Sequence, residues 1–213
     1  MLVTAIEPRR KGMSALYLDG QEYLVDTETL LSRRVSLGGE MSEEEAETLC
    51  AESSFRRAKE RALTILTYRD HSREELKRKL LASFDEEAAE AAVQKMCVLG
   101  LVNDAEYARK LARELLVRKR LGERRAASEM AAKGLDRDLI AQAVAEIAPD
   151  PVEQLATIIA KKYTPLPSDE KGRRRMHNAL ARMGYGWGEI RSAVARAEEN
   201  TESWVEPDEQ EEI

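Results

Sequence analysis

The sequence predicts a mainly α-helical fold, in which tandem three-helix, helix-turn-helix-like repeats form an elongated curved array with a small N-terminal β-rich segment. Three observations predict it. Apolar helix stripes end at Leu80, Met130 and Leu180, at successive intervals of 50 residues and each shortly before a turn. The chain of 213 residues is 35% charged and only 5% aromatic, a composition more typical of a helical repeat protein than of a compact enzyme. The first 40 residues differ from the rest, because they carry short β-forming runs.

The β-rich segment spans residues 1–40. Its strand-like runs are residues 2–6, 13–18 and 22–25. Asp19-Gly20 lies between the second and third runs and is a strong signal for a tight hairpin turn, so we expect a three-stranded sheet. Asp26 or Thr27 can then cap a short helix.

The helical region begins with an acidic lead-in at residues 41–55. Ser42 and Glu45 have the spacing of a capping box, and Ser53-Ser54 is a point where the lead-in and the first repeat can separate. The three-helix repeats are residues 56–102, 103–149 and 150–197. Residues 198–213 form an acidic tail that we expect to be disordered, because it holds too few apolar residues to pack.

Each repeat consists of one longer helix followed by two shorter ones. Ser72 and Asp85 are the expected N-caps of the shorter helices in the first repeat, and Gly122 takes the place of Ser72 in the second. After the middle helix, Leu135, Ile140, Val144 and Ile147 of the second repeat correspond to Tyr185, Ile190, Val194 and Ala197 of the third. One such module buries too little apolar surface alone, so neighbouring modules are expected to stack.

Positive and negative charge are segregated along the chain. The net charge of −6 hides this, because residues 40–54 and 198–213 contain acids but neither lysine nor arginine. Basic clusters lie near the entry to the second helix of each repeat: Arg73, Lys77, Arg78 and Lys79; then Arg118, Lys119, Arg120, Arg124 and Arg125; then Lys171, Arg173, Arg174 and Arg175. Two readings stay open: the cations decorate a solvated helix face, or they form a surface that meets phosphates or an acidic protein groove.

Catalytic and metal-binding patterns are absent from the sequence. His71 and His177 lie in different repeats, and neither neighbours a serine or cysteine in a recognisable nucleophile motif. Gly38-Gly39 lacks the lysine and hydroxyl residue of a phosphate-binding loop. We therefore expect a binding protein rather than an enzyme, with no cofactor and no metal.

The sequence also bears on location. No apolar run reaches the roughly 20 residues that cross a bilayer, and the first residues lack the pattern of a secretion signal. A cytoplasmic protein without membrane contact is expected. Cys50 and Cys97 have no metal-ligand spacing and are interpreted as structural thiols.

A series of motifs resembles the RecX family. Residues 69–80 carry the pattern Arg-x-x-Ser-x-x-Glu-Leu-x-x-Lys-Leu, formed here by Arg69, Ser72, Glu75, Leu76, Lys79 and Leu80. Residues 99–108 resemble the family's junction into the second repeat. Residues 129–135 and 180–185 resemble its later helix turns, and residues 16–20 its N-terminal extension. The resemblance covers residues 1–197, while Gly122 and the missing glycine after Ser83 depart from it and leave the turn geometry open.

The resemblance implies a regulator of the RecA recombinase. Members of the family bind RecA and lie in the groove of the RecA–DNA filament, where they mostly inhibit recombination, ATP hydrolysis and the coprotease activity of the SOS response. We expect the second and third repeats to supply the contact, through eight cations: Arg118, Lys119, Arg120, Arg124, Arg125, Arg173, Arg174 and Arg175. A monomer is expected, and a weak contact with DNA stays open.

Two other functions stay open beside this one. Three short helices with a turn before the last also form helix-turn-helix domains that bind nucleic acid directly. Acids on the third helices of the first two repeats, such as Asp85 and Asp136, argue against this alternative, and only Trp187 and Arg191 in the third repeat suit it. A helical adaptor for an unrelated protein is the remaining possibility.

Overall fold

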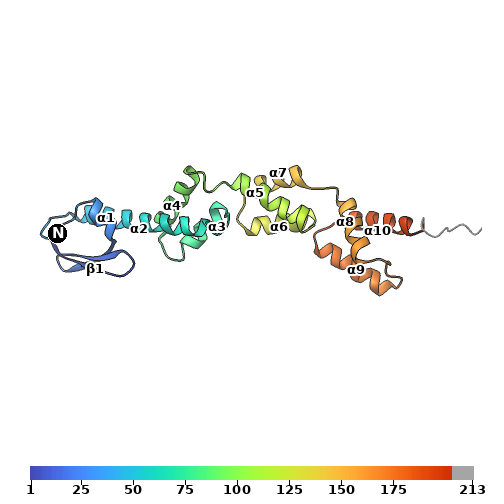
Figure 1. Ribbon diagram of the computed structural model, residues 1–213, viewed down its shortest axis with the longest axis horizontal. Helices are drawn as coiled ribbons and strands as arrows, with labels where there is room; N and C mark the ends of the chain where they lie inside the picture. Colours follow the sequence, from blue (N-terminus) through green and yellow to red (C-terminus); the bar gives the residue numbers. More distant parts are fainter. Residues whose placement is uncertain (203–213) are drawn as a thin grey trace, which may run out of the picture. The chain divides into compact units, whose positions relative to one another are not determined.

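The computed structural model describes residues 1–202, and the chain divides into two compact units, Met1–Asp104 and Ala105–Ile213. Figure 1 shows the order of the elements, a short β-sheet followed by helices. The predicted mainly helical fold, with tandem three-helix domains after a small N-terminal sheet, is confirmed.

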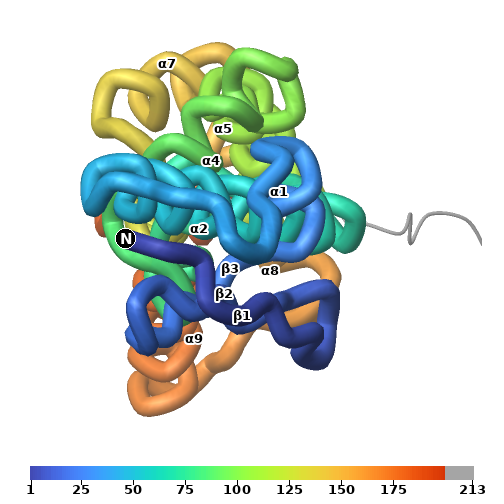
Figure 2. The backbone as a smooth tube through the Cα atoms, turned by 90° about the vertical axis from the view of Figure 1, so that its left-hand side faces the viewer, coloured from blue at the N-terminus to red at the C-terminus, as the bar shows by residue number. Residues whose placement is uncertain are grey.

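The first unit begins with an antiparallel sheet in the order β1-β2-β3, whose strands lie side by side in Figure 2. The strands are β1 (Val3–Pro8), β2 (Met13–Leu18) and β3 (Gln21–Asp26). Asp19 and Gly20 join β2 to β3 with positive φ angles of 48° and 84°, as the expected tight hairpin requires. The buried side chains of Leu16, Leu18 and Val25 give the sheet its apolar face.

Two helices cover that face. Asp26 caps α1 (Thr27–Ser32) by accepting a hydrogen bond from the Thr29 N–H at 3.1 Å. Ser42 and Glu45 form the predicted capping box at the start of α2 (Glu43–Leu66). This helix is continuous over 24 residues and is not divided at Ser53-Ser54. Ser53 is buried there, and its hydroxyl oxygen accepts a 2.7 Å hydrogen bond from the Asp26 N–H, which ties the helix to the end of the sheet.

The second half of α2 packs with α3 (Arg73–Leu80) and α4 (Glu86–Val98) as the first three-helix domain. Ser72 and Asp85 cap α3 and α4, as predicted. The motif that begins at Arg69 has a structural explanation here. Arg69 donates two hydrogen bonds to the Glu75 carboxylate, at 3.0 and 2.6 Å, and the Leu76 and Leu80 side chains are fully buried.

The second unit contains two more apolar cores, one for each further three-helix group. The first group comprises α5 (Asp104–Ala112) with the π-helical η1 (Arg113–Arg118) that continues it, α6 (Glu123–Ala132) and α7 (Arg137–Ile147). The second comprises α8 (Pro151–Lys162), α9 (Glu170–Arg182) and α10 (Trp187–Glu202). Because α10 extends to Glu202, the tail expected from residue 198 starts inside a helix, and the rest of it lies outside the described residues.

Candidate partner-binding site

The eight cations proposed to contact a partner all lie in the second unit, on three segments. Arg118, Lys119 and Arg120 follow one another at the end of η1, Arg124 and Arg125 are in the first turn of α6, and Arg173, Arg174 and Arg175 are in the first half of α9. All are exposed except Arg120, which is half-buried. A surface rich in cations is therefore present, and its geometry depends on how α6, α8 and α9 meet.

The start of α6 lies against the turn that ends α9. The Gly122 N–H donates a 2.9 Å hydrogen bond to the Met183 carbonyl oxygen. A Cβ atom added to Gly122 would lie 2.5 Å from the carbonyl carbon of Gly184, and one added to Gly184 would lie 2.5 Å from the Cβ of Arg125. Glycine therefore replaces the serine found in the first repeat because two backbones touch here.

A buried hydrogen-bond network fixes the same junction. The Tyr185 hydroxyl is 2.9 Å from the Arg120 carbonyl oxygen and 2.6 Å from Oε1 of Gln154, so its single hydrogen is shared between two acceptors. Nε2 of Gln154 in turn donates to the Leu116 carbonyl oxygen at 2.6 Å. Burial raises the pKa of the Tyr185 hydroxyl, which stays protonated as a donor. The network holds the end of η1 firmly against α8 and α9.

Together these contacts build a cationic pocket of about 330 Å³. It is lined by Arg118, Lys119, Arg120, Ile158, Lys161, Lys162 and Met183. Lys161 and Lys162 were not among the predicted residues. Their position in the last turn of α8 is an ordinary place for lysine, since cations there interact favourably with the helix dipole, and no local pattern pairs them with η1.

The structure does not bring Arg173, Arg174 and Arg175 to this junction. Arg173 precedes Gly184 by 11 residues along α9, a distance of about 16 Å at the α-helical rise. Arg173 donates to the Pro167 carbonyl oxygen at 3.1 Å and lies 3.5 Å from the Glu198 carboxylate. The eight predicted residues thus form two groups, one at the α6–α9 junction and one toward the start of α9.

Two of these exposed cations have half-buried ion-pair partners on their own helices. Arg118 lies 2.7 Å from Glu114, and Arg125 lies 2.9 Å from Glu129. Surface pairs of this kind contribute only about 0.2–1 kcal/mol, so another anion can replace the carboxylate at little cost.

An aromatic pair lies near the same turn. Trp187 is 57% exposed at the start of α10, and its ring centroid is 5.5 Å from that of His177 on α9. The two rings are tilted by 31°. The exposed indole suits stacking against a planar group such as a nucleic-acid base. This property makes Trp187 suitable for the helix-turn-helix alternative.

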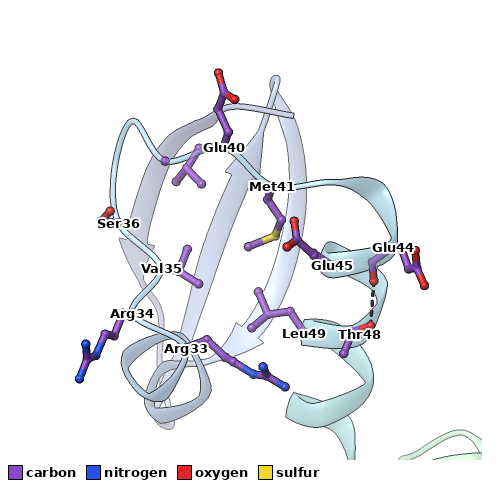
Figure 3. A pocket seen from close by; sticks show the side chains of 12 residues that line it. Arg33, Arg34, Val35, Ser36, Glu40, Met41, Glu44, Glu45, Thr48 and Leu49 are labelled. Carbon is purple, nitrogen blue, oxygen red and sulfur yellow. Dashed lines mark hydrogen bonds between the residues drawn. The ribbon is translucent and has the colours of Figure 1, made fainter.

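The first unit has a second pocket, of about 420 Å³, between residues 33–41 and the start of α2 (Figure 3). Three of its polar side chains have protein partners. Arg33 pairs with Glu52, Glu45 accepts from the Ser42 N–H, and the Thr48 hydroxyl donates to the Glu44 carbonyl oxygen. We assign no ligand to this pocket.

Chemistry-bearing groups elsewhere in the described part of the chain have structural roles. His71 is buried and hydrogen-bonded through Nδ1 to the Arg69 carbonyl oxygen. Burial raises the pKa of both thiols, Cys50 and Cys97, which makes them poor nucleophiles. Within residues 1–202, no group of three histidine, cysteine or acidic side chains could hold a metal ion, and no helix is long and apolar enough to cross a membrane.

Comparison with known proteins identifies the three-helix domains. Residues 58–96 match the model of the first RecX three-helix domain, and residues 103–144 match that of the second. A regulatory protein RecX from Stenotrophomonas maltophilia (strain R551-3) is 35% identical over 137 residues, which are 63% of this chain and 83% of that protein. One from Clostridioides difficile (strain 630) is 26% identical over 199 residues, or 91% of this chain and 94% of that protein.

Solved structures show the same fold. A crystal structure of a regulatory protein RecX superposes with a TM-score of 0.65 at 20% identity, and covers 91% of this chain and 98% of that one. The crystal structure of RecX from Lactobacillus salivarius gives a TM-score of 0.61 at 21% identity, and covers 68% of this chain and 97% of its own.

Proposed function

This chain belongs to the RecX family, and we propose on that basis that it regulates the RecA recombinase by binding RecA protein and the RecA–DNA filament. Binding in the filament groove limits filament growth, and so mostly inhibits recombination, ATP hydrolysis and the coprotease activity of the SOS response. The regulator acts by binding rather than by catalysis, and its place of action is the cytoplasm, where it meets RecA.

The second unit supplies the contact in this proposal. The observation that carries it is the collection of exposed cations at the end of η1, the start of α6 and the first half of α9. Arg124, Arg174 and Arg175 have no ion-pair partner within residues 1–202, and the pairs of Arg118, Arg125 and Arg173 lie at the surface and are exchangeable. Such a surface suits an anionic partner and makes binding dependent on salt.

Charge reversal tests the contact. We expect a variant with Arg124→Glu, Arg125→Glu, Arg173→Glu and Arg174→Glu to bind preformed RecA filaments at least about tenfold more weakly than the wild type, because each carboxylate repels an anionic surface. Binding is measured by the anisotropy of labelled protein at fixed salt, after a thermal melt has shown that the variant is folded.

The control reverses four exposed cations of the first unit: Arg10, Lys11, Arg61 and Lys95. This control changes the net charge by the same amount as the second-unit variant. It should bind RecA filaments with the affinity of the wild type. If the second-unit variant kept wild-type affinity for the filament, the assignment of the contact to these arginines would be wrong.

A further inference from the structure

The cationic pocket between η1, α8 and the end of α9 is more specific than a charged helix face. Five of its seven lining residues are cations, and none is an acid. Among them only Arg118 has an ion-pair partner in the described part of the chain, the half-buried Glu114. Like charges held close together repel, and a bound anion would relieve this repulsion.

The helix dipole explains part of this convergence but not all of it. Lys161 and Lys162 end α8, and Arg118 ends η1, so each interacts favourably with the carbonyl end of its own helix. Arg120 has no such reason to be there, because it lies beyond the helix in a left-handed conformation with φ of 52°. Glycine is the usual residue at such a position, and it fills the turns after α4, α6 and α9 as Gly100, Gly134 and Gly184.

The exposed Lys11 and Arg34 share this left-handed backbone, so what distinguishes Arg120 is that its strained position also lies in the lining of the cationic pocket. The pocket around it is also held in place, because the Arg120 carbonyl oxygen accepts from the buried Tyr185 and the Gly122 N–H bonds to the Met183 carbonyl oxygen. A rigid pocket binds a ligand without first ordering its own walls.

We propose that this pocket binds consecutive backbone phosphates of a single-stranded nucleic acid. A nucleic-acid strand combines a charge at every residue with a less polar sugar and base, which matches five cations around the apolar side chains of Ile158 and Met183. A single carboxylate side chain would leave most of the cations without a partner.

This inference deepens the proposed function. It rests on that function in one respect, which is that the protein meets the strand in the RecA–DNA filament. It assigns Arg118, Lys119 and Arg120, together with Lys161 and Lys162, to phosphate. The remaining arginines of the second unit are left to the protein partner. Binding to a strand can be measured without RecA, so this inference and the proposed function can fail separately.

The test is the anisotropy of a labelled oligothymidylate of about 16 nucleotides, titrated with the full chain at several salt concentrations. Two pocket variants are compared with the wild type: Arg120→Gly, which removes a cation while placing glycine where the backbone favours it, and the double variant Lys161→Gln with Lys162→Gln. Arg61→Gln with Lys95→Gln is the control, since it removes two exposed cations from the first unit.

We expect each pocket variant to bind the strand about tenfold more weakly. The slope of log affinity against log salt should fall by about 0.7 for Arg120→Gly and by about 1.4 for the double lysine variant, because each lost cation removes one phosphate contact to a single strand. The control should keep the wild-type affinity and slope. Inorganic phosphate should compete only weakly, because it offers a single anion to a site made for a strand.

Four results would overturn the proposal. They are wild-type protein that does not bind the strand, pocket variants that bind it as the wild type does, an equal loss in the control, and inorganic phosphate held as tightly as the strand. A polyglutamate peptide of matched length tests the remaining alternative, in which the pocket binds an acidic protein. If the pocket variants lost that peptide and kept the strand, the pocket would belong to an acidic protein instead.

Discussion

Arg120 combines a left-handed backbone with a side chain that lines the cationic pocket. Its φ of 52° belongs to the left-handed region, which costs a residue with a Cβ atom about 1 kcal/mol relative to glycine. The adjoining Lys119 ends η1 in an ordinary right-handed conformation with φ of −83°. The strain is therefore confined to Arg120, whose side chain lines the cationic pocket.

Arg120→Gly should therefore raise the free energy of unfolding by up to about 1 kcal/mol, because the relieved strain exceeds the extra chain entropy that glycine loses on folding. The Tyr185 hydrogen bond survives, because it is made to the backbone carbonyl. Urea denaturation of the variant and the wild type measures the difference. Lys119→Gly is the matched control, and it should lower the free energy of unfolding, since glycine gains nothing at a right-handed position and loses more chain entropy. Destabilisation by Arg120→Gly would show that the arginine side chain supports the fold.

His71 gives a second effect at the residue scale, one that depends on pH. Its ring is only 4% exposed, and burial holds its pKa below the ordinary value of 6.5. The unfolded chain therefore takes up a proton more readily than the folded chain. The contribution of the neutral His71 side chain to the free energy of unfolding is fully present above pH 6.5, and it is lost as the pH falls below that value.

Unfolding by urea at about pH 7.5 and about pH 5.5, on either side of the ordinary histidine range, measures this loss. We expect the wild type to lose more stability between the two conditions than His71→Gln, which cannot titrate at that position. Both proteins contain the same carboxylates, so the carboxylate contribution cancels when the loss of stability in one protein is compared with the loss in the other. Equal losses in the two proteins would mean that His71 does not titrate differently on folding.

At the scale of elements, the contact between α6 and the end of α9 holds two three-helix groups of the second unit together. Gly122→Ala would place a Cβ atom 2.5 Å from the Gly184 backbone, which cannot move without disturbing the hydrogen bond to Met183. We expect destabilisation of about 1–3 kcal/mol, the usual range for overpacking a fixed contact.

Thermal or urea unfolding of the full chain tests this contact. Gly188→Ala is the matched control, because an added Cβ there meets nothing within 4 Å among the described residues and α10 favours alanine over glycine. It should be neutral or stabilising. If Gly122→Ala were equally well tolerated, the two backbones could not be as close as described.

The same elements show what local sequence can predict. Ser72, Asp85 and the capping box at Ser42 act within three residues, and the Asp19-Gly20 turn joins neighbouring strands, so short patterns predicted them. The continuity of α2 could not be predicted that way. Ser53 looks like a helix breaker, but its hydroxyl bonds to the distant Asp26 N–H once the sheet is in place.

The geometry of the candidate site could be predicted only in part, for the same reason. Runs of arginine are visible in the sequence, and all eight predicted cations lie in the second unit. The pocket needs Lys161 and Lys162, which are about 40 residues from Arg120 along the chain and reach it only through the packing of α8. Arg173, Arg174 and Arg175 are separated from the pocket because they lie toward the start of α9 and the pocket lies at its end. The repeat spacing of 50 residues does not reveal this separation.

Across the whole molecule, the two units carry different features. The first unit holds the sheet, the capped α2 helix and the motif that begins at Arg69, all of which stabilise structure. The second unit carries the cations proposed to meet RecA and a nucleic-acid strand. The net charge of −6 therefore does not describe the binding surface.

If this member of the RecX family restrains the RecA filament, as proposed, the restraint appears in the rate of ATP hydrolysis by a cognate RecA on single-stranded DNA. The protein is titrated into the reaction at fixed salt, and its binding to the same DNA without RecA is measured alongside. We expect ATP hydrolysis to fall at protein concentrations well below those that coat free DNA. Unchanged hydrolysis, or inhibition only once the DNA itself is saturated, would contradict it.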